Sequence, residues 1–236
     1  MGDKWLKLPF NFDVDRLETD LKTAGQYKWI DHVNTRIYEG QWRAIPLRAV
    51  DGRIDNIAAV STDAKEYKNT EALDRCPFFQ EVINTMKCET TAVRLLSMGP
   101  GAKIKRHDDY PCGFKSGHAR LHVPIMTNPD VKIFIADGPV FFGEGECWYM
   151  NAEYPHSLEN LGDSPRVHLV IDCIVNPWLE TIFTEAGYTE PVVNHKYGDP
   201  SINDENVALI IAELERDGDP VKLEMATKLR NLSLAG

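Results

Sequence analysis

The chain has 236 residues, a formal net charge of −10 and a pI near 5.2. With 43% apolar residues it is long enough to bury a core, and one domain with appendages is the expected organisation. The acidic balance argues against a general nucleic-acid binder, because neutralising phosphates needs clustered lysines and arginines. We therefore expect no nucleic-acid partner.

The cysteine pattern and the hydropathy bear on the compartment. Five cysteines are an odd number, and no two of them form a CxxC pair, so neither a disulfide framework nor a zinc ribbon is indicated. No segment reaches the roughly 18 consecutive apolar residues that a membrane span requires. The sequence thus predicts a cytoplasmic protein with reduced thiols and no membrane contact.

The first third of the chain mixes helical and extended patterns. Residues 13–21 have apolar side chains at helical spacing behind Asp13, which predicts a capped amphipathic helix. Residues 28–50 are rich in β-branched and aromatic side chains, and Glu39-Gly40 interrupts them, so we expect strands joined by a turn. A second helix is expected over residues 77–87.

The centre of the chain reads as short strands separated by turns rich in glycine and proline, the pattern of a jelly roll. The strand-like runs are residues 92–97, 103–107, 118–126, 131–136, 140–142, 146–150 and 166–175. The fold class expected is therefore mainly β with flanking helices. We expect residues 1–175 to form this domain and residues 176–236 to form a C-terminal helical extension.

The C-terminal extension carries two apolar stripes at helical spacing. Their members are Val207, Ile210, Ile211 and Leu214 in one stripe, and Met225, Leu229 and Leu232 in the other. These stripes have three interpretations: packing on the protein's own β domain, covering its cavity as a lid, or forming a homodimer contact. Packing on the chain's own domain is the commonest arrangement.

A distinctive constellation lies within the β-rich segment. His107 and Asp109 are two positions apart, so in a strand they point to the same face, whereas Asp108 points away. A second histidine, His156, follows much later. Two histidines and one carboxylate on one face of a metal leave positions open for other ligands, which is typical of non-haem Fe(II) oxygenases.

Basic residues alternate with apolar ones on two other strands. His118, Arg120 and His122 share one face of the first, and Arg166 and His168 share one face of the second. If the apolar alternates pack on the outer core, these five groups line the interior of the roll. A buried guanidinium needs an acidic partner or an anionic ligand, and a small dicarboxylate matches arginine's paired donors.

Taken singly, each of these residues has an ordinary interpretation. A lone histidine is more often packed or solvated than bound to metal, short motifs recur by chance, and buried arginines often form structural salt bridges. Cys112 and Cys147 lie near the constellation in the sequence, but a buried cysteine commonly behaves as a small apolar residue. Only the ordered combination of motifs favours a functional site.

These motifs resemble the aspartyl/asparaginyl β-hydroxylase family, a branch of the Fe(II)- and 2-oxoglutarate-dependent dioxygenases that includes bacterial L-proline cis-hydroxylases. The likeness extends over about residues 92–172. The motifs that carry it are Arg94-Leu95-Leu96, Pro100-Gly101, Ile104, His107-x-Asp109, Arg120-Leu121-His122-Val123-Pro124, Gly145-Glu146-x-Trp148, Pro155-His156 and Pro165-Arg166-Val167-His168-Leu169-Val170.

The resemblance implies a double-stranded β-helix with Fe(II) held by His107, Asp109 and His156. It implies 2-oxoglutarate and O2 as cosubstrates, with ascorbate supporting turnover and with succinate and CO2 as coproducts. Arg166 would pair with the distal carboxylate of 2-oxoglutarate, and His122 would lie beside its metal-binding end. Arg120 would serve either the cosubstrate or a carboxylate of the substrate, and the sequence leaves both roles open.

Two departures from the vertebrate member of the family bear on the substrate. That enzyme lacks the acid that matches Asp109, and it has an arginine where this chain has His118. The sequence around His156 and Arg166 resembles the proline cis-hydroxylases more than it resembles the vertebrate enzyme. We therefore expect a free amino acid or a similarly small carboxylated substrate. Candidate substrate contacts are His118, Arg94, Tyr110, Asn151 and Trp42.

Three alternatives remain open at this stage. The first is β-hydroxylation of aspartate or asparagine in a peptide or protein. The second is a jelly-roll module that binds an anion or a metal without turnover, since a fold alone does not imply chemistry. The third is a cupin-like enzyme that uses another metal. The complete triad together with Arg166 favours the oxygenase.

Overall fold

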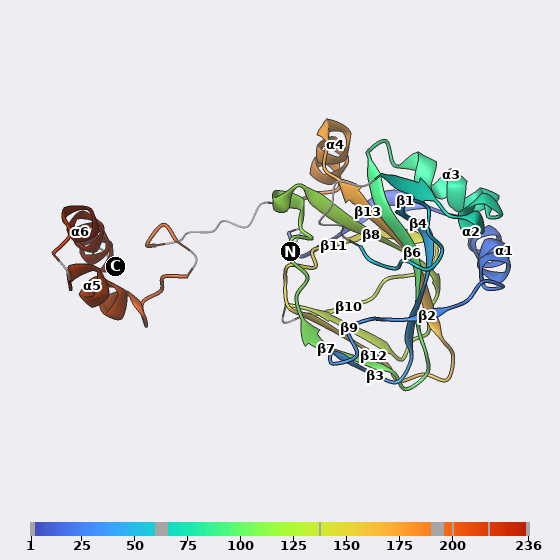
Figure 1. Cartoon of the computed structure of the whole chain (residues 1–236), viewed down its shortest axis with the longest axis horizontal. Coiled ribbons are helices and arrows are strands. Elements are labelled where there is room, and N and C mark those ends of the chain that lie inside the picture. Colours follow the sequence, from blue (N-terminus) through green and yellow to red (C-terminus); the bar gives the residue numbers. More distant parts are fainter. Residues whose placement is uncertain are drawn as a thin grey trace. The chain divides into compact units, whose positions relative to one another are not determined.

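A computed structural model of the chain describes residues 3–59, 66–136, 138–189, 196–199, 201–216 and 218–234. The chain divides into two compact units, Met1–Thr189 and Glu190–Gly236. Figure 1 shows strands and helices in the first unit and a helical pair in the second. Each unit is described by itself below.

The first unit contains a large antiparallel sheet of eight strands, in the order β1-β11-β8-β13-β6-β4-β2 with β5 paired to β4. Its bounds are β1 Trp5–Asn11, β2 Ile30–Asp31, β4 Trp42–Val50, β5 Tyr67–Asn69, β6 Thr90–Met98, β8 His118–Met126, β11 Glu146–Met150 and β13 Arg166–Ile174. The central strands β8, β13 and β6 carry the basic residues singled out above.

A second antiparallel sheet of five strands faces the first (Figure 1) in the order β10-β9-β12-β7-β3. Its bounds are β3 Tyr38–Glu39, β7 Lys103–His107, β9 Val131–Ile135, β10 Gly138–Val140 and β12 His156–Asn160. Strand β10 begins two residues before the expected run, and β1, β5 and β12 were not expected. The two sheets and their flanking helices confirm the predicted fold class, a mainly β jelly roll.

Side-chain alternation divides the core of the first unit into two parts. Leu121, Val123, Leu169 and their neighbours pack on one face of the large sheet against apolar residues of the helices. A separate apolar cluster fills the space between the sheets, because it joins residues of both, such as Met98 of the large sheet and Ile104 of the small one. Of the five basic residues expected to line the interior, Arg120, His122 and Arg166 line cavities between the sheets, whereas His118 and His168 line neither of these cavities.

In the described part of this unit, the α-helices are α1 Val14–Ala24, α2 Glu71–Asp74, α3 Pro77–Thr85 and α4 Pro177–Glu185. Helices α1 and α3 form as expected, with the Asp13 side chain accepting from the backbone N–H of Arg16 at the start of α1. The expected domain boundary after residue 175 needs correction. Helix α4 belongs to the first unit, because its Leu179 and Phe183 are fully buried in the core beneath the large sheet.

The second unit consists mainly of α5 Val207–Glu215 and α6 Pro220–Leu234. The two predicted stripes pack on each other: Val207 and Ile211 of α5 bury against Ala226 and Leu229 of α6. Met225 is the exception, with 53% of its surface exposed. Among the described residues, no helix is long and apolar enough to cross a membrane.

Candidate active site

Three of the predicted residues converge between the sheets. His107 at the end of β7 lies directly opposite His156 at the start of β12. Asp109 follows β7, and its backbone N–H donates to the carbonyl of Ala152 at 2.8 Å. One ligand atom from each of His107, Asp109 and His156 lies within 4.8 Å of the others. This spacing fits three protein ligands around one metal ion.

Backbone contacts fix which ring nitrogens face a metal. The Nδ1–H of His107 donates to the carbonyl of Lys105 at 2.8 Å, and the Nδ1–H of His156 donates to the carbonyl of Tyr154 at 3.0 Å. Both rings therefore keep Nε2 as an unprotonated donor for a metal. Two imidazoles and one carboxylate suit Fe(II) and leave other coordination positions open. By donor set and orientation, the three residues fit the metal that the sequence implies.

The local electrostatics hold Asp109 and His156 in their ligating forms. Burial alone would raise the pKa of Asp109, but the charges of Arg120, His156 and His107 outweigh it and lower that pKa below its usual value. Burial also lowers the pKa of His156. The carboxylate is thus ionised and His156 neutral near pH 7, as metal binding requires.

Arg166 lies in the same inter-sheet space, at the start of β13, and is 3% exposed. Its Nη2 donates to Nδ1 of His168 at 2.8 Å. Within the described residues no carboxylate pairs with Arg166, and its Nε has no hydrogen-bond partner. Burial lowers the pKa of Arg166 to about 9. A buried cation without a counter-ion is costly, so this position is suited to an anionic ligand.

Arg120 and Arg94 are placed differently, because Asp172 lies between them. The Nε of Arg120 donates to Asp172 at 2.7 Å, and its Nη1 donates to Asp109 at 2.7 Å. Arg94 donates from Nη2 to the other oxygen of Asp172 at 2.8 Å. Burial alone would lower the pKa of Arg120, but the charges of Asp172 and Asp109 outweigh burial and raise that pKa. Arg94 has only Asp172, which it shares with Arg120, and burial lowers the pKa of Arg94.

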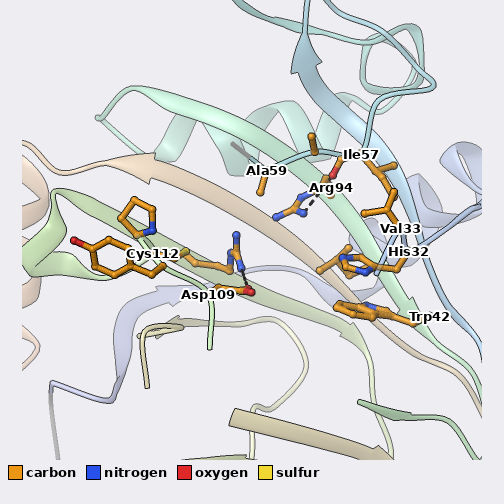
Figure 2. Close-up of a pocket in the computed structure, with 13 residues that line it drawn as sticks. His32, Val33, Trp42, Ile57, Ala59, Arg94, Asp109 and Cys112 are labelled. Atoms are coloured by element: carbon orange, nitrogen blue, oxygen red, sulfur yellow. Dashed lines mark hydrogen bonds and ion pairs between the residues drawn. The ribbon is translucent and has the colours of Figure 1, made fainter. Parts of the chain in front are cut away.

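Two adjoining cavities meet at this network. One, of about 50 Å³, is lined by the three candidate ligands together with His122 and Arg166. The other, of about 240 Å³, is lined by Arg94, Arg120, Asp109 and several apolar residues. In Figure 2, Arg94, Asp109 and the stacked rings of His32 and Trp42 border this larger cavity. Trp42, Leu96, Asp109 and Arg120 line both cavities.

Comparison with known proteins places this geometry in a family. The sequence profile described as Aspartyl/Asparaginyl beta-hydroxylase matches residues 13–176, more than half of the chain. The chain belongs to this family. The match includes every strand of the two sheets except β1, contains all three candidate ligands, and ends before the second compact unit.

One protein similar to this chain is the L-proline cis-4-hydroxylase of Rhizobium meliloti (strain 1021). It is 27% identical over 191 residues, which cover 80% of this chain and 66% of the relative. The chain therefore spans slightly less than two thirds of the length of that curated relative.

Solved structures share the fold at low sequence identity. The non-haem α-ketoglutarate-dependent epimerase SnoN from nogalamycin biosynthesis superposes with a TM-score of 0.51 at 10% identity, over 73% of this chain and 77% of SnoN. A prolyl-4-hydroxylase of Pseudomonas putida gives 0.45 at 14% identity, over 74% of this chain and 94% of that one. The SnoN likeness supports the jelly-roll assignment of this β-hydroxylase family member.

The predicted substrate contacts fall into two groups. Trp42, Arg94 and Tyr110 line the larger cavity, and Tyr110 is 80% exposed at its edge. His118 and Asn151 do not line either described cavity. The ring of His118 contacts the Ser116 carbonyl at 2.9 Å, and Asn151 donates to the carbonyl of Asp3 at 3.0 Å. Both therefore have structural contacts in this family member.

Several site residues were not predicted from the sequence. His32 stacks on Trp42 with ring centroids 3.5 Å apart, and burial, followed by the charge of Arg94, lowers its pKa to about 4. Asp172, which was assigned no functional role from the sequence, bridges two arginines. Cys112, given little weight in the sequence, lines the larger cavity, whereas Cys147 is buried in the core beneath the large sheet.

Proposed function

We propose that this protein is an Fe(II)- and 2-oxoglutarate-dependent dioxygenase that hydroxylates an unactivated C–H bond of an amino acid or a similarly small carboxylated molecule. One observation carries the proposal: the open metal triad and the uncompensated Arg166 line the same cavity. A metal alone explains the triad, but only an anion beside that metal explains a buried guanidinium without an acid. Membership of the family supports the same reaction.

The residues have distinct roles in this proposal. His107, Asp109 and His156 hold the metal, and Arg166 pairs with the distal carboxylate of 2-oxoglutarate while His122 lies beside the cosubstrate. Bound Fe(II) supplies the redox chemistry that couples decarboxylation of 2-oxoglutarate by O2 to oxidation of a C–H bond, releasing succinate and CO2. The chain's own contribution is to orient both carboxylated molecules and to limit which bond is presented.

Arg120 acts in this scheme by positioning Asp109. Two of its donor groups are already committed to Asp172 and Asp109, so we propose that it orients the metal ligand instead of binding the cosubstrate. Arg94 differs, because its Nε is buried without a partner and its Nη1 makes only a long 3.4 Å contact with the Ile57 carbonyl. We assign to Arg94 the carboxylate of the substrate.

The larger cavity supports a small substrate. Its volume of about 240 Å³ is bounded by the rings of Trp42 and His32 and by Ile57. Such a cavity is large enough for one amino-acid side chain with its carboxylate, and its apolar wall favours an aliphatic body over a second charge. The L-proline cis-4-hydroxylase relative acts on a substrate of that size.

The test is succinate formation by the purified full chain with Fe(II), ascorbate, O2 and 2-oxoglutarate, with and without a panel of free amino acids and short acidic peptides. We expect an amino acid to stimulate succinate release and to gain one oxygen in mass. Stimulation by peptides alone would transfer the proposal to peptide β-hydroxylation. Absence of succinate from iron-loaded protein under every condition would overturn the dioxygenase.

We further propose a cytoplasmic homodimer. All five cysteines are free thiols, which suits a reducing compartment. In the second unit, Leu209, Val221 and Leu234 are each more than 60% exposed, and such apolar side chains on a helical pair suit contact with a second copy. Light scattering should give a dimer for the full chain and a monomer for a chain ending at Thr189; equal masses would remove the dimer proposal.

A further inference from the structure

Two histidines lie beside Arg166, and no described acid pairs with it, although Asp109 lines the same small cavity. His168 is fully buried on β13 and does not line either cavity, whereas His122 on β8 lines the smaller one. Phe142 covers both imidazoles, with ring centroids 6.0 Å and 6.3 Å away. The guanidinium is therefore buried and is held by a histidine that is not a counter-ion.

Hydrogen-bond chemistry fixes the state of His168. A guanidinium has only donors, so Nδ1 of His168 must be the acceptor of the 2.8 Å contact from Arg166. The Nδ1 of His122 lies 3.4 Å from the same nitrogen, near the long limit for a hydrogen bond. Because Nδ1 of His168 accepts from a cation it carries no proton, and burial lowers the pKa of His168 well below its usual value, so the ring is neutral.

We propose that His168 is a positioning residue that fixes the Arg166 guanidinium by a neutral acceptor, so that the charge stays available for the distal carboxylate of a bound dicarboxylate. This inference rests on the proposed function, because it takes the cosubstrate as the ligand of Arg166. It assigns to His168 a role in affinity for the dicarboxylate without direct contact with it.

The choice of a neutral acceptor has a clear physical consequence. An acid at position 168 would form a buried ion pair with Arg166, and that pair would compete with any ligand carboxylate for the same guanidinium. An apolar residue would leave the guanidinium unoriented. A neutral acceptor avoids both outcomes. It restricts the rotamers of the Arg166 side chain, and it has no charge that would compete with the ligand carboxylate.

Three substitutions separate these cases, and two of them are matched in shape. The Oδ1 atom of asparagine or aspartate lies the same number of bonds from Cβ as Nδ1 of histidine. His168→Asn thus keeps a neutral acceptor, His168→Asp adds a charge at the same place, and His168→Leu removes the acceptor. The measurements are calorimetric affinity for 2-oxoglutarate of the full Mn(II)-loaded chain without O2, and urea denaturation of the metal-free chain.

We expect His168→Asn to bind 2-oxoglutarate within about threefold of wild type and His168→Asp to bind on the order of 100-fold more weakly, the scale of losing a buried charge pair. His168→Leu should fall between them. The metal-free His168→Asp chain should unfold at higher urea than wild type, because Arg166 gains a counter-ion. In turnover, KM for 2-oxoglutarate should rise in His168→Asp while kcat at saturation changes little.

The outcomes distinguish this inference from the function on which it rests. Wild-type protein that takes up Mn(II) but does not bind 2-oxoglutarate would overturn the proposed function. Wild-type binding with unchanged affinity in His168→Asp would overturn only the role of His168. If His168→Leu fails to fold, the Asn and Asp pair still decides, because a purely structural histidine predicts no difference in dicarboxylate affinity between two folded variants.

Discussion

Arg120 and Arg166 offer a direct comparison, since they are buried to 8% and 3% exposure on the paired strands β8 and β13. Arg120 is held by two carboxylates, whereas Arg166 contacts a neutral histidine and no described acid. The same side chain in the same sheet thus has two different uses. A compensated arginine organises its neighbours, and an uncompensated one marks the place where a ligand brings the missing charge.

The largest expected effect comes from removing the uncompensated cation. Arg166→Met should weaken 2-oxoglutarate binding on the order of 1,000-fold, because the distal carboxylate loses a desolvated ion pair. The metal-free protein should be no less stable than wild type, since burial of an unpaired guanidinium disfavours folding. Calorimetry and urea denaturation test the two parts. Loss of stability with retained binding would reverse the roles assigned to the two arginines.

The opposite pattern is expected for the acid that compensates the other arginines. Asp172→Asn leaves Arg94 and Arg120 without their shared carboxylate and should lower the free energy of unfolding by about 3–5 kcal/mol. Urea denaturation of the metal-free chain measures this change. Asp163→Asn, at an exposed position, is the matched control and should have no measurable effect. If Asp172→Asn changes the free energy of unfolding as little as Asp163→Asn does, then the ion pairs of Asp172 contribute little to stability.

Arg94 is intermediate, because it shares one acid and faces the larger cavity. Arg94→Met should raise KM for the amino-acid substrate by about 10- to 100-fold, the usual scale for one charge-assisted contact, with little change in KM for 2-oxoglutarate. Steady-state kinetics with each substrate varied in turn separates the two constants. If KM for 2-oxoglutarate rises more than KM for the amino acid, then the cosubstrate binds at Arg94 in the larger cavity, and the proposed assignment of the two cavities is wrong.

The smallest effect concerns pH. The pKa of His32 is about 4 in the folded protein against an ordinary value of 6.5, so between these values the unfolded chain binds more protons and stability falls as pH falls. His32→Phe keeps the stack on Trp42 and removes this titration. Its loss of stability between pH 7 and pH 5 should be smaller than that of wild type by less than about 1 kcal/mol, because His32 is part-exposed. Urea denaturation at pH 7 and pH 5 measures both losses of stability. Equal losses in wild type and in His32→Phe would show that His32 does not titrate between these pH values.

Local rules recovered much of the architecture from the sequence. Alternation along β8 and β13 placed Arg120 and His122 opposite Leu121, because that pattern depends only on neighbouring residues. The same rule joined His107 with Asp109, although Asp109 lies beyond the end of β7. There the turn that follows the strand, and not the pleat, brings the carboxylate to the histidines.

Non-local pairing explains what the sequence did not reveal. The bridge formed by Asp172 depends on the register of β13 against β6 and β8, and no local pattern reports register across separate strands. His32 reaches the cavity because β2 pairs with β4, which brings it beside Trp42. Strand β12 was missed because its residues, His156–Asn160, are mostly polar between turn signals. The helix after Asn176 was assigned to the extension because its buried contacts lie far away in sequence.

The most direct test of the open metal centre is Fe(II)-dependent succinate release from 2-oxoglutarate by wild type and by His156→Ala, with metal content measured in parallel. His156 supplies one of three converging ligand atoms, so the variant should fold, lose most of its bound iron and release no succinate. Wild type should retain iron and release succinate. A folded His156→Ala protein that binds iron and turns over like wild type would contradict the ligand assignment and the site built on it.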